Sequence, residues 1–133
     1  MKINKYLYFI AICAFVIISS KAKAQDSIVN IRAKVTKIDS TKSFYIFNIS
    51  YNRNKATFFV TKTCGDSINS IKLRKNVVYN FNFRRRFYSF QNGHLPTVNT
   101  VVKYADDKIV WTSKMKKIFY EECLNMCGMY IKQ

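Results

Sequence analysis

The clearest structural signal in the chain is the stretch Val77-Val78-Tyr79-Asn80-Phe81-Asn82-Phe83-Arg84. From its third residue, Tyr79, onward, aromatic side chains alternate with polar ones. Successive side chains of a β-strand point to opposite faces, so a period of two predicts a strand with one buried, aromatic face. We therefore expect a mainly β fold built around a strand at residues 77–84.

Other segments on both sides of this strand are also rich in alternating or β-branched residues. They are residues 28–38, 44–51, 55–62, 97–104 and 108–112. In the first, the phase breaks before Ile38, which indicates a bulge or a strand end. In the second, Phe44 and Ile46 make both faces apolar. The short polar segments Asn52-Arg53-Asn54 and Asp106-Asp107 suit hairpin turns.

Two segments have a spacing nearer to that of a helix. Apolar residues within residues 65–74 predict one or two helical turns, with Asp66 near the N-cap. Within residues 113–126, four apolar residues fall at i, i+3, i+4 and i+11, which fits one face of a helix. The alternative for the second segment is irregular chain that leads to a last short strand at residues 129–131.

This order of elements resembles that of small exported proteins with an OB-fold, a Greek-key barrel. Three meandering strands precede a short helical connection and further strands, and residues 71–83 look like the lead-in and fourth strand of such barrels. The resemblance implies a small OB-like β-barrel that acts as a binding module. A β-sandwich is the alternative fold, and neither fold specifies a ligand.

The first 24 residues look like a secretory signal peptide. Lys2 and Lys5 precede an apolar run at residues 6–18, and an Ala-Lys-Ala cleavage site follows. The run is shorter than the roughly 20 apolar residues that a membrane-spanning helix needs. We expect cleavage after residues 1–24, one β-rich domain at residues 25–133 without a transmembrane segment, and an exported protein, periplasmic or secreted.

Composition narrows the classes of function. The 133 residues carry a formal charge of +16, and 49% of them are hydrophobic, which is too apolar for a disordered chain. The leader holds four lysines and no acid, so residues 25–133 keep +12, a charge that favours polyanionic partners. The chain has one His and no nucleophile elbow, P-loop or dinucleotide fingerprint. We therefore expect neither an enzyme nor a cofactor.

Three cysteines lie outside the leader: Cys64, Cys123 and Cys127. The last two are four residues apart, a spacing at which neither a helix nor a strand brings their Cβ atoms within disulfide reach. We expect a disulfide from Cys64 to Cys123 or Cys127, as suits an exported protein. Zinc held by the three cysteines and His94, or a redox thiol, is a weaker alternative, and no metal is expected.

Basic residues gather on both sides of the strand at residues 77–84, with aromatic residues after it. The candidate ligand-binding residues are Lys72, Arg74, Lys75, Arg84, Arg85, Arg86, Phe87 and Tyr88. OB-type barrels bind single strands by combining a positive groove with aromatic stacking. Because we expect export, genomic nucleic acid is an improbable partner.

These observations predict a non-catalytic binding module for an anionic ligand, such as a glycan, a lipid head group or another polyanion. The alternative is a protein-interaction or structural accessory of the cell envelope, whose partner would be an envelope protein. The sequence leaves the choice between these two open.

Overall fold

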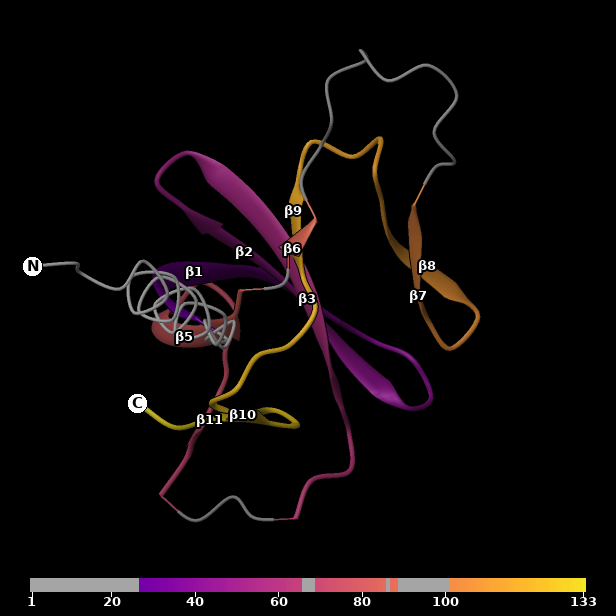
Figure 1. Cartoon of the computed structure of the whole chain (residues 1–133). Helices are drawn as coiled ribbons and strands as arrows, with labels where there is room; N and C mark the ends of the chain where they lie inside the picture. The colour runs from indigo at the N-terminus through magenta and orange to yellow at the C-terminus, as the bar shows by residue number, and fades with distance from the viewer. Residues whose placement is uncertain (1–26, 66–68, 86, 89–100) are drawn as a thin grey trace, which may run out of the picture.

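The computed structural model describes residues 27–65, 69–85, 87–88 and 101–133 (Figure 1). The predicted signal peptide at residues 1–24 lies outside them. The described residues form strands joined by turns, and no helix occurs among them. The prediction of a mainly β fold is therefore confirmed. None of these segments is a helix of the length and hydropathy needed to span a bilayer.

The largest sheet, called the main sheet, has the strand order β5-β1-β2-β3-β9-β6. Its strands are β1 (Ile28–Ser40), β2 (Phe44–Tyr51), β3 (Asn54–Thr61), β5 (Val78–Arg84), β6 (Phe87–Tyr88) and β9 (Ile118–Tyr120). All neighbouring strands are antiparallel except β3 and β9. The β2–β3 hairpin turns at Asn52 and Arg53, whose φ angles of 42° and 65° are typical of a tight hairpin turn.

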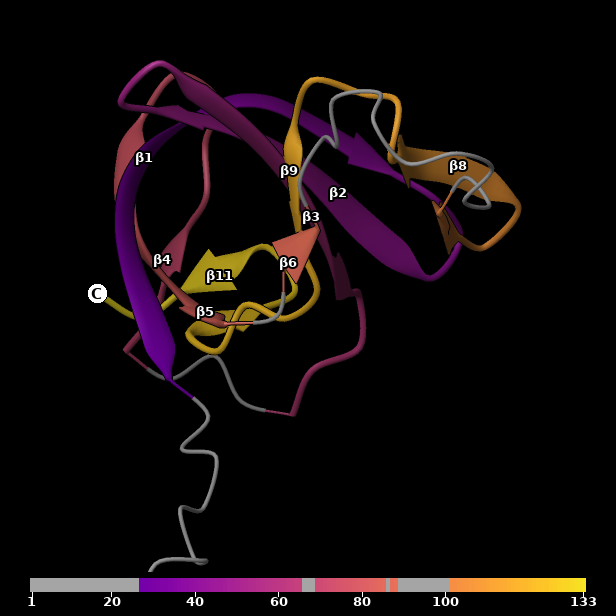
Figure 2. The ribbon, with the colours of Figure 1, turned by 45° about the horizontal axis from the view of Figure 1, so that its top comes forward.

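Strand β1 is long and changes partner along its length. Residues Ile28 to Lys34 pair with β5, and residues Lys34 to Ser40 pair with β2. The β2 register shifts between Val35 and Lys37, a bulge close to the predicted break in phase. Figure 2 shows β1 as an arc that bends around the small strands beneath it.

Two smaller sheets pack against the main sheet. One has the order β10-β11-β4, from β4 (Ile71–Lys72), β10 (Met126–Cys127) and β11 (Tyr130–Ile131). The other is a hairpin of β7 (Val102–Ala105) and β8 (Lys108–Thr112), which turns at Asp106 and Asp107 as predicted. In Figure 1 this hairpin stands to one side of the main sheet.

Both predicted helices are wrong in the described residues. In the first segment, Asn69 lies in a turn and Ser70 leads directly into β4, which pairs with β11. Residues 66–68 of this segment lie outside the described part. In the second segment, Ile118 and Phe119 are neighbours on β9 and pack into different cores. Their spacing imitated a helical face because both sides of this strand are apolar.

The predicted closed barrel is not observed among the described strands. The main sheet starts at β5 and ends at β6, although only residues 85 and 86 separate these strands in the chain. At this point the backbone N–H of Arg84 donates to the Glu122 carbonyl (3.1 Å), and that of Arg85 donates to the Ser27 carbonyl (3.0 Å). The chain thus changes partners at the place where a barrel would close.

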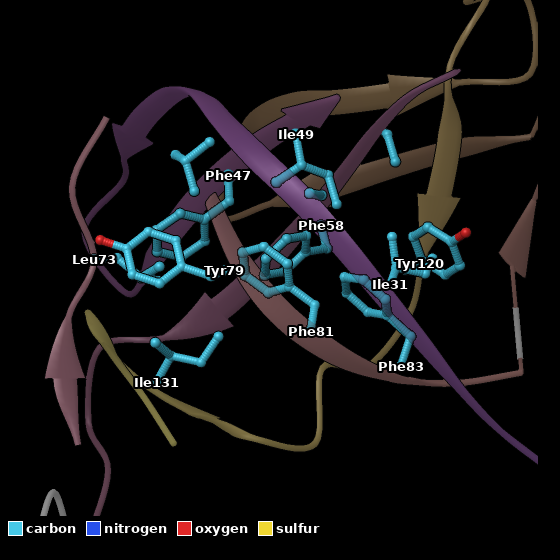
Figure 3. Packing of buried hydrophobic residues seen from close by; sticks show 13 residues of the cluster. Ile31, Phe47, Ile49, Phe58, Leu73, Tyr79, Phe81, Phe83, Tyr120 and Ile131 are labelled. Atoms are coloured by element: carbon cyan, nitrogen blue, oxygen red, sulfur yellow. The ribbon is translucent and has the colours of Figure 1, made fainter. Parts of the chain in front are cut away.

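The main core lies on the inner face of the main sheet and is rich in aromatic rings (Figure 3). Phe58 contacts Phe81 and Phe83 edge-on, with ring centroids 5.5 and 5.0 Å apart, and Phe83 stacks on Tyr120 at 4.2 Å. Such ring pairs stabilise a core beyond the burial of their area. Ile131 of β11 also packs into this core, which ties the small sheet to the main one.

A second core lies on the opposite face of β2 and β9. The fully buried Trp111 of β8 packs there against Phe119, with Ile46 in the same cluster. The Trp111 indole N–H donates to the Lys117 carbonyl (2.9 Å), so the buried ring has its polar atom satisfied. The β7–β8 hairpin therefore covers the outer face of β2, β3 and β9.

A disulfide joins Cys64 to Cys127, which is one of the two predicted pairings. It connects the end of the β3 segment to β10, across 63 residues of sequence. The remaining described cysteine, Cys123, is a free thiol beside Asn125, and burial raises its pKa to about 12. A thiol with so high a pKa is protonated at neutral pH and a poor nucleophile.

We expect the C64A/C127A double variant to lose about 4 kcal/mol of unfolding free energy, because the disulfide restricts a long loop in the unfolded chain. Denaturant unfolding of both proteins measures this loss. The control is C123A, which keeps the disulfide and should lose clearly less. Equal losses in the two variants would show that the cross-link adds no stability.

A second prediction concerns the turn of the β7–β8 hairpin. The Asp106 carboxylate accepts hydrogen bonds from the Thr41 hydroxyl and the Ser43 N–H (2.8 Å), which lower its pKa below the ordinary 3.8. A lowered folded-state pKa stabilises the fold above pH 3.8, and this contribution is lost as the pH falls through the folded-state value. The D106N variant should therefore lose part of the acid sensitivity of thermal unfolding. D107N, which alters the neighbouring carboxylate, should keep it; a parent-like acid profile for D106N would contradict the assignment.

Candidate functional site

The predicted ligand-binding residues fall into two groups that the structure does not bring together. Lys72, Arg74 and Lys75 are exposed just before β5, and Arg84 and Arg85 lie at its far end. A strand rises about 3.3 Å per residue, so roughly 20 Å of β5 separates the two groups. Their role in binding stays a prediction, and the described members of the two groups lie at opposite ends of β5.

The second group is also less available to bind an anion than its basic composition suggests. Arg84 forms an ion pair with Glu122 at 2.7 Å, on a half-buried side chain. Arg86 lies outside the described residues, and Phe87 and Tyr88 are described only as the backbone of β6. The expected platform of stacked aromatic rings therefore lies outside the described side chains.

A hollow of about 470 Å³ lies over the first half of β1 and the end of β2. Its cationic side chains are Arg32 and Lys34, which alternate along β1 and are both exposed. The residues that line it are Asn30, Ile31, Arg32, Lys34, Ser50, Tyr51, Asn52 and Val78. We call this open depression the cationic hollow.

A third cation borders the hollow on the next strands. Lys34 pairs with Ser50 of β2, and Ser50 pairs with Lys55 of β3. Paired residues of neighbouring strands carry their side chains on the same face. Since each strand spacing is about 4.8 Å, Lys55 lies about 10 Å from Lys34 across the same face.

None of the described acidic residues lines this hollow. Asp39 pairs with Lys108, and this contact together with the Ser40 N–H lowers its pKa. Glu121 pairs with Lys103 at 3.1 Å. No described acidic side chain lines the cationic hollow. Its charge is therefore not neutralised by a carboxylate in its lining.

A second depression, of about 340 Å³, has a mixed character. Arg84, Lys103, Glu121 and Glu122 line it together with two phenylalanines, and the four charged groups form two ion pairs. Such paired charges attract an external ion weakly, because each is already compensated. This depression is a weaker candidate for an anion site than the cationic hollow.

A close pair of titratable groups beside the cationic hollow is unsuited to act as a general base. The hydroxyl groups of Tyr51 and Tyr120 are 2.6 Å apart, and burial raises the pKa of Tyr120. A phenol with a raised pKa stays protonated at neutral pH and cannot act as a general base. Within the described ranges, no three His, Cys, Asp or Glu side chains gather as a metal site would require.

Sequence reasoning overlooked Arg32 and Lys34 as site residues. They were visible only as polar positions of an alternating strand, a pattern that solvent-facing side chains share. The informative features are the cross-strand partners, which place Ser50 and Lys55 on the same face. Those partners cannot be inferred from the spacing of β1 alone.

Comparisons of the chain with protein-family models, with curated proteins and with solved structures find no match. The function proposed below therefore rests on the geometry and charge of the chain itself.

Proposed function

We propose that the protein is a non-catalytic binding module for an anionic ligand, and that the cationic hollow is its site. The observation that carries this proposal is the presence of two cationic side chains, Arg32 and Lys34, in a hollow whose lining contains no described acid. Asn30, Ser50 and Asn52 add side chains that can donate hydrogen bonds to an oxyanion. Exposed lysine and arginine side chains close together raise the local concentration of anions.

The arrangement of strands supports an OB-like architecture as part of this proposal. A β1–β2–β3 meander, β5 beside β1 and a parallel β3–β9 pair suit a barrel of that type that is left partly open. OB-folds commonly bind oligomers on the face of strands 2 and 3. Here the β7–β8 hairpin covers that face with Trp111. We therefore place the site on β1 instead.

Export is part of the proposal as well. The Cys64–Cys127 disulfide is consistent with a protein that folds outside the reducing cytoplasm, in the periplasm or after secretion. Anions available there include acidic glycans, lipid head groups and acidic polypeptides.

A protein-interaction role in the cell envelope is the second candidate, because the β7–β8 hairpin exposes an apolar pair. Tyr104 and Ile109 are cross-strand partners and are 56% and 50% exposed. An exposed apolar pair of this kind suits a protein contact. A complex with an envelope protein that survives high salt and is disrupted by Y104S/I109S would favour this role.

The anion-binding function is tested by retention on heparin as a function of salt. We expect the R32Q/K34Q variant to bind more weakly than the parent protein and to show a shallower dependence of log affinity on log salt concentration. Each cation that no longer contacts the polyanion lowers that slope by about one, since fewer counterions are released.

The matched control is K114Q/K116Q, which removes the same charge from exposed lysines between β8 and β9. It should keep the slope of the parent protein. Equal weakening of both variants would mean that net charge, and not the cationic hollow, attracts the polyanion. Absence of any salt-dependent binding would contradict the proposed function.

A further inference from the structure

Among the described strands, the first half of β1 has a partner on one side only. Along Ile28 to Ala33 it pairs with β5, whereas its pairing with β2 begins at Lys34. The chain leaves β2 at Tyr51 and turns back through Asn52 into β3. In the part of the chain that the structure describes, no strand continues the position of β2 beside residues 28–33.

The register of β1 and β5 identifies the backbone groups on this unpaired edge. The Ser27 carbonyl accepts from the Arg85 N–H, and the Val35 N–H donates to the Val77 carbonyl. The register between these points is continuous. Backbone groups alternate in direction along an antiparallel strand. The odd-numbered residues of β1 therefore bond β5, and the N–H and C=O groups of Asn30 and Arg32 point away from it, toward the cationic hollow.

The outer edge of β5 shows how the chain satisfies such groups elsewhere. The Asn125 side chain accepts from the Asn82 N–H (2.9 Å) and donates to the Asn80 carbonyl (2.8 Å). The Leu124 N–H donates to the Asn82 carbonyl (2.7 Å). The C-terminal segment thus acts as a strand substitute along β5. Nothing among the described residues does the same for Asn30 and Arg32.

We propose that an extended, acidic segment of another polypeptide adds to this edge of β1 as an extra strand. Its backbone would bond the N–H and C=O groups of Asn30 and Arg32, and its carboxylates would lie beside Arg32 and Lys34. Strand addition of this kind combines main-chain bonds with side-chain selection on alternate positions. The inference rests on the proposed function and specifies the class of anion that the cationic hollow binds.

The charges of Arg32 and Lys34 determine which side chains an added strand should carry. Residues that pair directly across strands share a face, so every second side chain of the added strand would lie on the cationic side of β1. The intervening side chains would face Ile31 and Tyr51, which are apolar or aromatic. The expected partner therefore alternates acidic with apolar residues. A second copy of the same edge is disfavoured, because Arg32 and Lys34 would meet their own like charges.

Main-chain geometry favours a polypeptide over a glycan or a lipid head group. The groups of Asn30 and Arg32 repeat every two residues, about 6.7 Å along the strand, with a donor and an acceptor at each. An extended peptide has the same repeat and the complementary groups. A polyanion without such a backbone can contact the cations but leaves these donors and acceptors to water.

The test uses the full protein and a capped peptide of alternating glutamate and valine, long enough to cover residues 28–33. Two modified peptides are compared with it: one is N-methylated at the glutamates, the other at the valines. We expect the added strand to run antiparallel to β1, as β2 does. The glutamates opposite Asn30 and Arg32 then have their N–H groups facing β1, so methylation there should weaken binding about tenfold more than methylation at the valines. The unmodified peptide should also slow hydrogen exchange at the Asn30 and Arg32 amides.

The remaining outcomes separate this inference from the proposed function. Equal binding of all three peptides, without slower exchange at Asn30 and Arg32, would overturn strand addition while anion binding stands. Heparin binding tighter than that of the peptide, again without such protection, would assign the cationic hollow to a glycan and also overturn it. If neither peptide nor heparin binds, both the inference and the proposed function fail.

Discussion

The structure depends on one strand being shared by two partners. β1 pairs with β5 along its first half and with β2 along its second, and the two ladders overlap only at Lys34. This offset bends the main sheet around its aromatic core, where Phe58, Phe81 and Phe83 meet. It also leaves one edge of the first half unpaired among the described strands. The same constraint thus gives the chain its core and its candidate site.

The two faces of the main sheet explain why we place the candidate site on β1. The β7–β8 hairpin covers the outer face of β2, β3 and β9 through Trp111, and its turn is fixed by Asp106 and by the Lys108–Asp39 ion pair. The carboxylates of Asp39 and Asp106 are therefore engaged at the far end of β1. At its near end, no described carboxylate lines the hollow that holds Arg32 and Lys34. A surface with unbalanced positive charge and backbone groups unpaired among the described strands is suited to an acidic strand.

Much of the strand pattern could be predicted from the sequence, because alternation reports directly on burial. Residues 44–51 and 77–84 are examples, and the apolar Phe44 and Ile46 already indicated a second buried face. The helix at residues 113–126 was predicted wrongly because Ile118 and Phe119 pack into two different cores from opposite sides of one strand. The candidate site depends on which strands pair with β1, and long-range pairing leaves no local signal in Arg32 or Lys34. The disulfide was narrowed to two pairings by spacing alone, and only the position of β10 beside β3 selects Cys127.

The central claim is that the N–H groups of Asn30 and Arg32 have no hydrogen-bond partner among the described residues and face solvent in the free protein. Amide hydrogen exchange tests this claim most directly. The account predicts fast exchange at these two amides and slow exchange at Ile31 and Ala33, whose backbone groups bond β5. Slow exchange at all four amides would contradict it, because it would mean that the second edge of β1 is already paired.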